Sequence, residues 1–113
     1  MAPGLRASGY AEEVNAAMFA HVNIWRLTEQ GSSTDDTIAR EIGTQLSQQE
    51  GFRSYTLVRS AEREVVAITV FDTRDHLELA VHAVAPFARE RLASLAQGEP
   101  ERRSGDVVYH TSA

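Results

Sequence analysis

The order of strand-like and helix-like segments restricts the fold of this chain more than any other feature of its sequence. Apolar residues alternate or run continuously at 19–27, 51–60, 65–71 and 106–111, and they recur at spacings of three and four at 35–49 and 77–95. The first pattern predicts strands and the second predicts amphipathic helices. The order β-α-β-β-α-β therefore predicts an α+β, ferredoxin-like domain, with a four-stranded antiparallel sheet and two helices on one of its faces.

Two of these segments contain features that predict local structure. The run Val65–Phe71 is apolar at nearly every position, which predicts an interior strand covered on both faces. Pro86 interrupts the second helical pattern, and this predicts either a kink or two abutting helices.

Length and composition limit the classes of protein to which the chain can belong. Its 113 residues suffice for one domain, which we place at residues 18–113, after an N-terminal extension at 1–17 that we expect to be flexible. The excess of 16 acidic over 11 basic residues argues against nucleic acid or an anionic membrane as a partner. No apolar run is long enough to cross a bilayer and no signal peptide is recognisable, so we expect a soluble, cytoplasmic protein. The absence of cysteine excludes disulfides and thiolate metal sites.

The first strand has two chemically different faces. Ala20, Val22 and Ile24 form a uniformly apolar face, which we expect the two helices to cover. The other face combines large apolar residues with an imidazole and an amide, at Phe19, His21, Asn23, Trp25 and Leu27. We expect this second face to be the open side of the sheet. Because monomers rarely expose an apolar patch of this size, we expect a second copy to cover it, giving a homodimer.

Three short motifs resemble those of a known family. Gly51, Phe52, Ser54 and Tyr55 form a Gly-aromatic-x-Ser-Tyr strand, Phe71 and Asp72 end a strand with an aromatic and an acidic residue, and His82 precedes Pro86 on a helix. In this order and spacing, over residues 18–112, the chain resembles the antibiotic-biosynthesis monooxygenase (ABM) family of dimeric α+β barrels. The resemblance implies a homodimer with a pocket between each sheet and its own helices. It also implies a mixed set of activities, which includes cofactor-free oxidation of polycyclic phenols or quinols by dioxygen, haem degradation, and reactions of small signalling or quinone metabolites.

The haem-degrading branch of this family resembles the chain at Asn23, its asparagine on strand one. That branch also needs a tryptophan on the second helix and a histidine further along it. The chain has Ala80 and the stretch Arg89–Arg91 near these positions, so we do not expect haem degradation. The tryptophan that usually ends strand three in the family is Phe71 here, which keeps a flat wall but has no indole N–H.

A cofactor-free oxygenase needs a base, a hydrogen-bond donor for an oxyanion, and apolar walls that hold a ring. Asn23 is the candidate donor, because its amide carries two N–H groups. His82 or His21 is the candidate base, because imidazole titrates near neutral pH. The candidate walls of a site for a small aromatic or quinone-type metabolite are Trp25, Tyr55 and Phe71.

These residues also allow a second hypothesis from a different functional class. Phe19, His21 and Trp25 fit a subunit interface as well as they fit a substrate pocket. The chain is then a non-catalytic homodimeric module for small-molecule binding or assembly, with these side chains packed by the partner and no cavity left. The four histidines are dispersed and form no i, i+4 pair, so we expect no metal, and the oxygenase hypothesis requires no cofactor.

Overall fold

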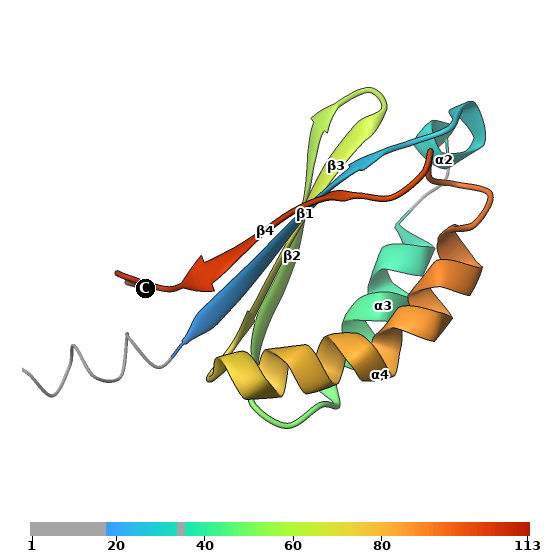
Figure 1. The fold of residues 1–113 in the computed structure, drawn as a ribbon. Helices are drawn as coiled ribbons and strands as arrows, with labels where there is room; N and C mark the ends of the chain where they lie inside the picture. Colours follow the sequence, from blue (N-terminus) through green and yellow to red (C-terminus); the bar gives the residue numbers. More distant parts are fainter. Residues whose placement is uncertain (1–17, 34–35) are drawn as a thin grey trace, which may run out of the picture.

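The computed structural model describes residues 18–33 and 36–113, and the extension expected at 1–17 lies outside them. The elements are β1 (Phe19–Arg26), α2 (Glu29–Ser33), α3 (Thr37–Ser47), β2 (Phe52–Ala61), β3 (Glu64–Phe71), α4 (Arg74–Leu92) and β4 (Glu101–Asp106). The strands form one antiparallel sheet in the order β2-β3-β1-β4. Figure 1 shows α3 and α4 together on one side of this sheet. The predicted α+β, ferredoxin-like architecture is therefore confirmed.

The start of α4 follows from its sequence. The hydroxyl of Thr73 caps the helix by accepting a hydrogen bond from the backbone N–H of His76 at 3.1 Å. Asp75 lies in the first turn and Arg91 in the last, which suits the helix dipole at both ends. Pro86 lies inside one continuous helix, so the alternative of two abutting helices is wrong. Figure 1 shows the axis of α4 bending along its length, as expected of a helix that contains proline.

The hydrophobic core fills one end of the space between the helices and the sheet. It consists of a buried cluster from α3, β3 and α4, namely Ile42, Leu46, Phe71, Leu77, Ala80 and Val84. Phe71 is 0 % exposed and meets the ring of Phe52 edge-on, with ring centroids 5.7 Å apart. Phe19 packs against the same cluster, which places its face of β1 toward the helices.

The expected orientation of β1 is wrong. The face with His21, Asn23 and Trp25 looks toward α3 and α4, and the face with Val22 and Ile24 is the one without helices. Alternation specifies two faces but not which of them a helix covers. The helices cover the face that carries Phe19. On β3 this residue pairs with Phe71, which is fully buried.

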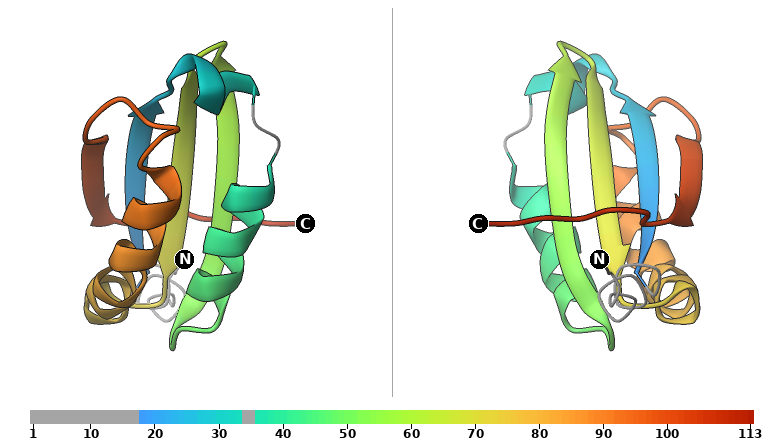
Figure 2. Two further views of the ribbon diagram at one scale, coloured as in Figure 1. Left: turned by 90° about the vertical axis from the view of Figure 1, so that its right-hand side faces the viewer. Right: turned by 90° about the vertical axis from the view of Figure 1, so that its left-hand side faces the viewer.

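The other face of the sheet carries no described helix, as Figure 2 shows. Its centre consists of three cross-strand pairs between β1 and β3, which are Ala20 with Val70, Val22 with Ile68, and Ile24 with Val66. We call these six residues, together with Val58 of β2, the open face. In the second half of β3, the residues that face the helices are buried. The residues on the open face of the same strand are only half-buried. The expectation that β3 is covered on both faces is therefore wrong for the single chain.

The last strand lies earlier in the sequence than expected. β4 pairs with β1 from Glu101 opposite Ile24 to Asp106 opposite Phe19, whereas the apolar segment at 106–111 mostly follows it. β4 is a polar edge strand, and backbone hydrogen bonds rather than apolar alternation define it. The segment after it carries the exposed side chains of Val108 and Tyr109, and Figure 1 shows it leading from the end of β4 away from the sheet.

Candidate functional site

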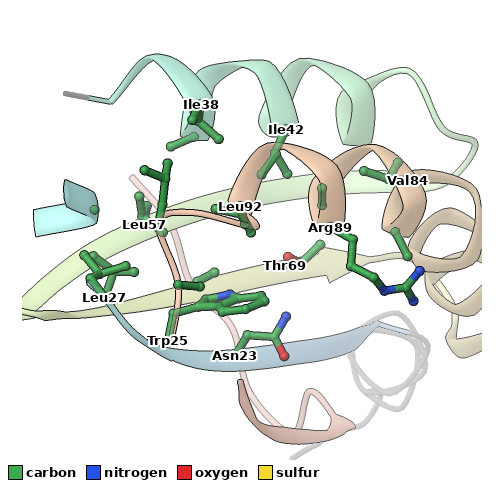
Figure 3. A pocket seen from close by; sticks show the side chains of 18 of the residues that line it. Asn23, Trp25, Leu27, Ile38, Ile42, Leu57, Thr69, Val84, Arg89 and Leu92 are labelled. Atoms are coloured by element: carbon green, nitrogen blue, oxygen red, sulfur yellow. The ribbon is translucent and has the colours of Figure 1, made fainter. Parts of the chain in front are cut away.

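A cavity of about 920 Å³ lies between the sheet and the helices. Its floor is formed by alternate residues of β1, namely His21, Asn23 and Trp25, by Leu27 just after this strand, and by neighbouring residues on β2 and β3. Its roof comes from the inner faces of α3 and α4, where Figure 3 shows Ile38, Ile42, Val84 and Leu92. The volume lies within the range of pockets that bind drug-sized molecules.

Most of the cavity wall is apolar, and two aromatic side chains contribute to it. Trp25 is the only tryptophan of the chain, and its indole lies flat along the floor in Figure 3. Tyr55 of β2 lines the opposite side, and burial raises the pKa of its hydroxyl, which therefore keeps its proton. The flat ring of a ligand could stack on the Trp25 indole, and an oxygen atom of the same ligand could accept a hydrogen bond from the Tyr55 hydroxyl.

His21 and Asn23 form the polar part of the floor. His21 is 9 % exposed, and burial together with the positive charge of Arg102 lowers its pKa from 6.5. The imidazole is therefore neutral at neutral pH, with one ring nitrogen able to accept a proton. The side-chain oxygen of Asn23 is buried and makes no hydrogen bond of good geometry to any described residue, although Asn23 interacts with the imidazole of His21 and partly offsets the lowering of its pKa. An unsatisfied acceptor at a cavity wall is a place where a ligand hydroxyl gains binding energy.

Two arginines line the cavity on the side of β4. Arg102 stands directly opposite Asn23 in the pairing of β1 with β4. Arg89 belongs to α4, and Figure 3 shows its side chain extending past Asn23. Neither residue was singled out from the sequence. To predict Arg102 as a lining residue, one needs the register of β4 against β1. The apolar pattern placed this strand too late in the sequence.

The structure brings four of the six candidate residues together and leaves two apart. His21, Asn23, Trp25 and Tyr55 all line the cavity. His82 is exposed on α4 and is not among the lining residues, because it lies one position, or about 100° of helix, beyond Val81 on the lining face. The Phe71 ring belongs to the packed core beyond the end of the cavity. We therefore exclude both residues from the proposed site.

Two surveys of the described residues bear on other kinds of site. No group of three or more histidine, aspartate or glutamate side chains in residues 18–33 and 36–113 is placed to hold a metal ion. Within the same ranges no helix has the length and apolar character needed to cross a bilayer.

Comparison with known proteins finds solved structures that share this fold. No protein-family model matches the chain, and no curated protein matches it.

Among solved structures, the chain is similar to a mutant form of SnoaB, a cofactor-independent oxygenase from Streptomyces nogalater. The two chains are 19% identical, the match covers 84% of this chain and 97% of that chain, and the TM-score is 0.71. It is also similar to an ABM protein from Nitrosomonas europaea, with 14% identity, coverage of 86% and 96%, and a TM-score of 0.74. A further ABM protein, from Bordetella bronchiseptica, has 13% identity, coverage of 82% and 99%, and a TM-score of 0.70. The fold that the three motifs predicted is therefore confirmed: over most of its length the chain is built like the ABM proteins.

Proposed function

We propose that this protein binds a small hydroxylated aromatic or quinone-type metabolite between its sheet and its helices and oxygenates it without a cofactor. The observation that carries the proposal is the cavity floor, where a neutral buried histidine and an unsatisfied asparagine adjoin a tryptophan that can hold a ring. The shared fold with SnoaB, a cofactor-independent oxygenase, agrees with this chemistry. No family model supports it, so the proposal rests on the site.

The side chains divide the work of such a reaction between them. The ring stacks on Trp25, and the apolar walls exclude water from it. His21 takes a proton from the bound substrate and so makes it electron-rich enough to react with dioxygen. The amide oxygen of Asn23 first accepts a hydrogen bond from the substrate hydroxyl. When the amide group flips, its N–H groups donate to the oxyanion that forms.

The stoichiometry of the proposed reaction requires no external reductant. A ring CH₂ group that reacts with one molecule of dioxygen yields a carbonyl group and one molecule of water. The substrate supplies both the electrons and the hydrogen atoms for that water. The protein therefore has to deprotonate, orient and shield the substrate, and it does not have to hold an electron carrier.

Oxygen consumption with a polycyclic anthrone as the probe tests this function. We expect turnover by the wild-type protein, and we expect Asn23→Ala to lower the rate by about 10- to 100-fold, because it removes the hydrogen bonds to the oxyanion. Gln48→Ala, which removes an exposed amide at the end of α3, is the matched control and should leave the rate unchanged. Quenching of Trp25 fluorescence without oxygen uptake by any anthrone or quinol would contradict catalysis and leave small-molecule binding alone as the function.

The open face is the basis for a proposed homodimer. Its seven residues are all aliphatic, and they form a continuous patch across β2, β3 and β1. A second copy that presents the same face would remove both patches from water in a two-fold arrangement. This arrangement leaves the cavity, which lies on the opposite side of the sheet, within each subunit.

A further inference from the structure

We propose that the ligand of this cavity carries a carboxylate, which Arg102 binds from the sheet layer and Arg89 from the helix layer. The inference rests on the proposed function and deepens it, because it names the substrate class as a hydroxylated aromatic acid. Three features of the structure support it: the position of Arg102, the position of Arg89, and the lack of a carboxylate partner for either among the described residues.

Arg102 lies beside the polar floor of the cavity. Residues directly opposite one another in an antiparallel pair have Cβ atoms about 4.5–5.5 Å apart, and Arg102 has this relation to Asn23. Its charge also acts on His21, since it is the second cause, after burial, of the lowered pKa of that imidazole. A ligand that reaches Asn23 is therefore within reach of the guanidinium of Arg102.

Arg89 approaches the same side of the cavity from above. α4 packs over β1, and β4 is the next strand outward from β1. Arg89 lies on the flank of α4 opposite to that of the buried Leu77 and Ala80, and Figure 3 shows its guanidinium beyond Asn23, away from Trp25. The two arginines thus belong to the two layers that bound this side of the cavity.

Neither guanidinium has a carboxylate partner among the described residues. Carboxylate partners lie within 4.0 Å of five other arginines, which are Arg26, Arg40, Arg74, Arg91 and Arg103. A guanidinium without an internal partner keeps its full set of donors for a ligand, and its planar fork matches a carboxylate.

The acidic residues that line the cavity do not occupy the space between Arg89 and Arg102. Asp36 is paired with Arg40 at 3.0 Å. Glu99 precedes β4 and therefore lies nearer the Trp25 end of β1 than Arg102 does. Glu90 follows Arg89 on α4, about 100° further around the helix.

The three contacts define one ligand geometry. The ring lies on Trp25, its hydroxyl donates to the unsatisfied side-chain oxygen of Asn23, and its carboxylate lies between Arg89 and Arg102. A neutral phenol of the same shape would keep the first two contacts and lose the third. The difference in affinity between these two ligands therefore isolates the arginine contacts.

Calorimetric titration with 4-hydroxy-2-naphthoate and with its neutral amide, 4-hydroxy-2-naphthamide, tests the inference. We expect the acid to bind at least about tenfold more tightly than the amide, because charge-assisted hydrogen bonds to arginine favour the acid alone. Arg102→Gln and Arg89→Gln should each weaken binding of the acid by about tenfold and leave binding of the amide unchanged. Arg40→Gln makes the same charge change on the exposed side of α3 and should alter neither affinity.

Quenching of Trp25, the only tryptophan, reports whether either compound occupies the cavity. Equal affinities for the acid and the amide, or equal losses of both in the Gln variants, would overturn the carboxylate and leave the proposed cavity function intact. If neither compound binds or quenches Trp25, the proposed binding function fails together with the inference.

Discussion

His21 and His76 occupy opposite electrostatic environments, although both lie near the sheet. Burial and Arg102 lower the pKa of His21, which favours the neutral imidazole. The hydrogen bond from His76 Nδ1 to Asp72 Oδ1, at 2.6 Å, raises the pKa of His76, and the same bond lowers that of Asp72. The carboxylate of Glu50 lies 3.5 Å from the other ring nitrogen of His76. His76 thus links the end of the α3–β2 connection to the start of α4.

This link predicts a pH-dependent contribution of His76 to stability. Because its pKa is raised in the folded state above 6.5, the stabilisation is fully present below pH 6.5 and is lost as the pH rises through the folded-state pKa. His76→Gln should therefore lower the melting temperature more at about pH 5.5 than at about pH 8.5. Thermal unfolding of both proteins across this range measures the difference. His110→Gln, in the exposed segment after β4, is the control, and a deficit of His76→Gln that is equal at every pH would contradict the role of the ion pair.

Part of the candidate site could be predicted residue by residue. Alternation alone places His21, Asn23 and Trp25 on one face of a strand, and the structure brings that whole face into the cavity. Helical periodicity could not place His82, because a position beside the apolar stripe can face either the core edge or solvent. Arg102 depends on strand register, which a polar edge strand does not encode in its hydrophobic pattern.

At the scale of the elements, α2 is a short helix in a segment where the apolar spacing predicted neither a helix nor a strand. Its position depends on Thr28, whose hydroxyl donates to the carbonyl of Ser94 at 2.9 Å and accepts from the N–H of Gly31 at 3.0 Å. A Cβ at Gly31 would collide with the carbonyl oxygen of Leu95. The glycine is thus required by the close approach of α2 to the segment after α4.

We expect Gly31→Ala to lower the free energy of unfolding by about 1–3 kcal/mol, because two backbone segments must separate to admit the methyl group. Urea denaturation measures this change. Gly105→Ala in β4 is the matched control, since no atom lies within 4 Å of the added Cβ, and it should leave stability unchanged or raise it by up to about 1 kcal/mol. Similar losses in both variants would show that the approach of α2 to Leu95 is not the cause.

The order and type of the main elements could be predicted because their periodicities are strong. The two longer helices and the first three strands all form where the apolar spacing indicated them. The position of the last strand and the face of β1 that the helices cover could not be predicted, for two different reasons. β4 is held by backbone pairing with β1, and both faces of β1 are apolar enough for a helix to cover.

At the scale of the whole molecule, the open face makes the proposed dimer testable. Ile68 lies at its centre, between Val22 on β1 and Thr56 on β2. Ile68→Asp should raise the dissociation constant of the dimer by at least about a hundredfold, because an unpaired carboxylate would be buried between the two sheets. Sedimentation velocity with a circular-dichroism check of folding measures this effect.

The control for the interface is an exposed aliphatic residue elsewhere. Leu79 is 68 % exposed on α4, and Leu79→Asp should leave the dimer intact. Val58→Asp, at the β2 margin of the open face, should weaken the dimer less than the central change and provides a second variant if Ile68→Asp does not fold. A wild-type protein that sediments as a monomer at every concentration would refute the pairing.

The pairing of the first strand with the last has a consequence for biosynthesis. β1 leaves the ribosome early, but one of its edges stays without a neighbour until β4 has been translated and released from the exit tunnel. Arg102 arrives only with β4, so a nascent chain that already has β1, β2, β3 and both long helices still lacks one wall of the cavity. A chain that stalls before β4 therefore leaves this edge of β1 unpaired, and an unpaired strand edge is a template on which another chain can add a strand.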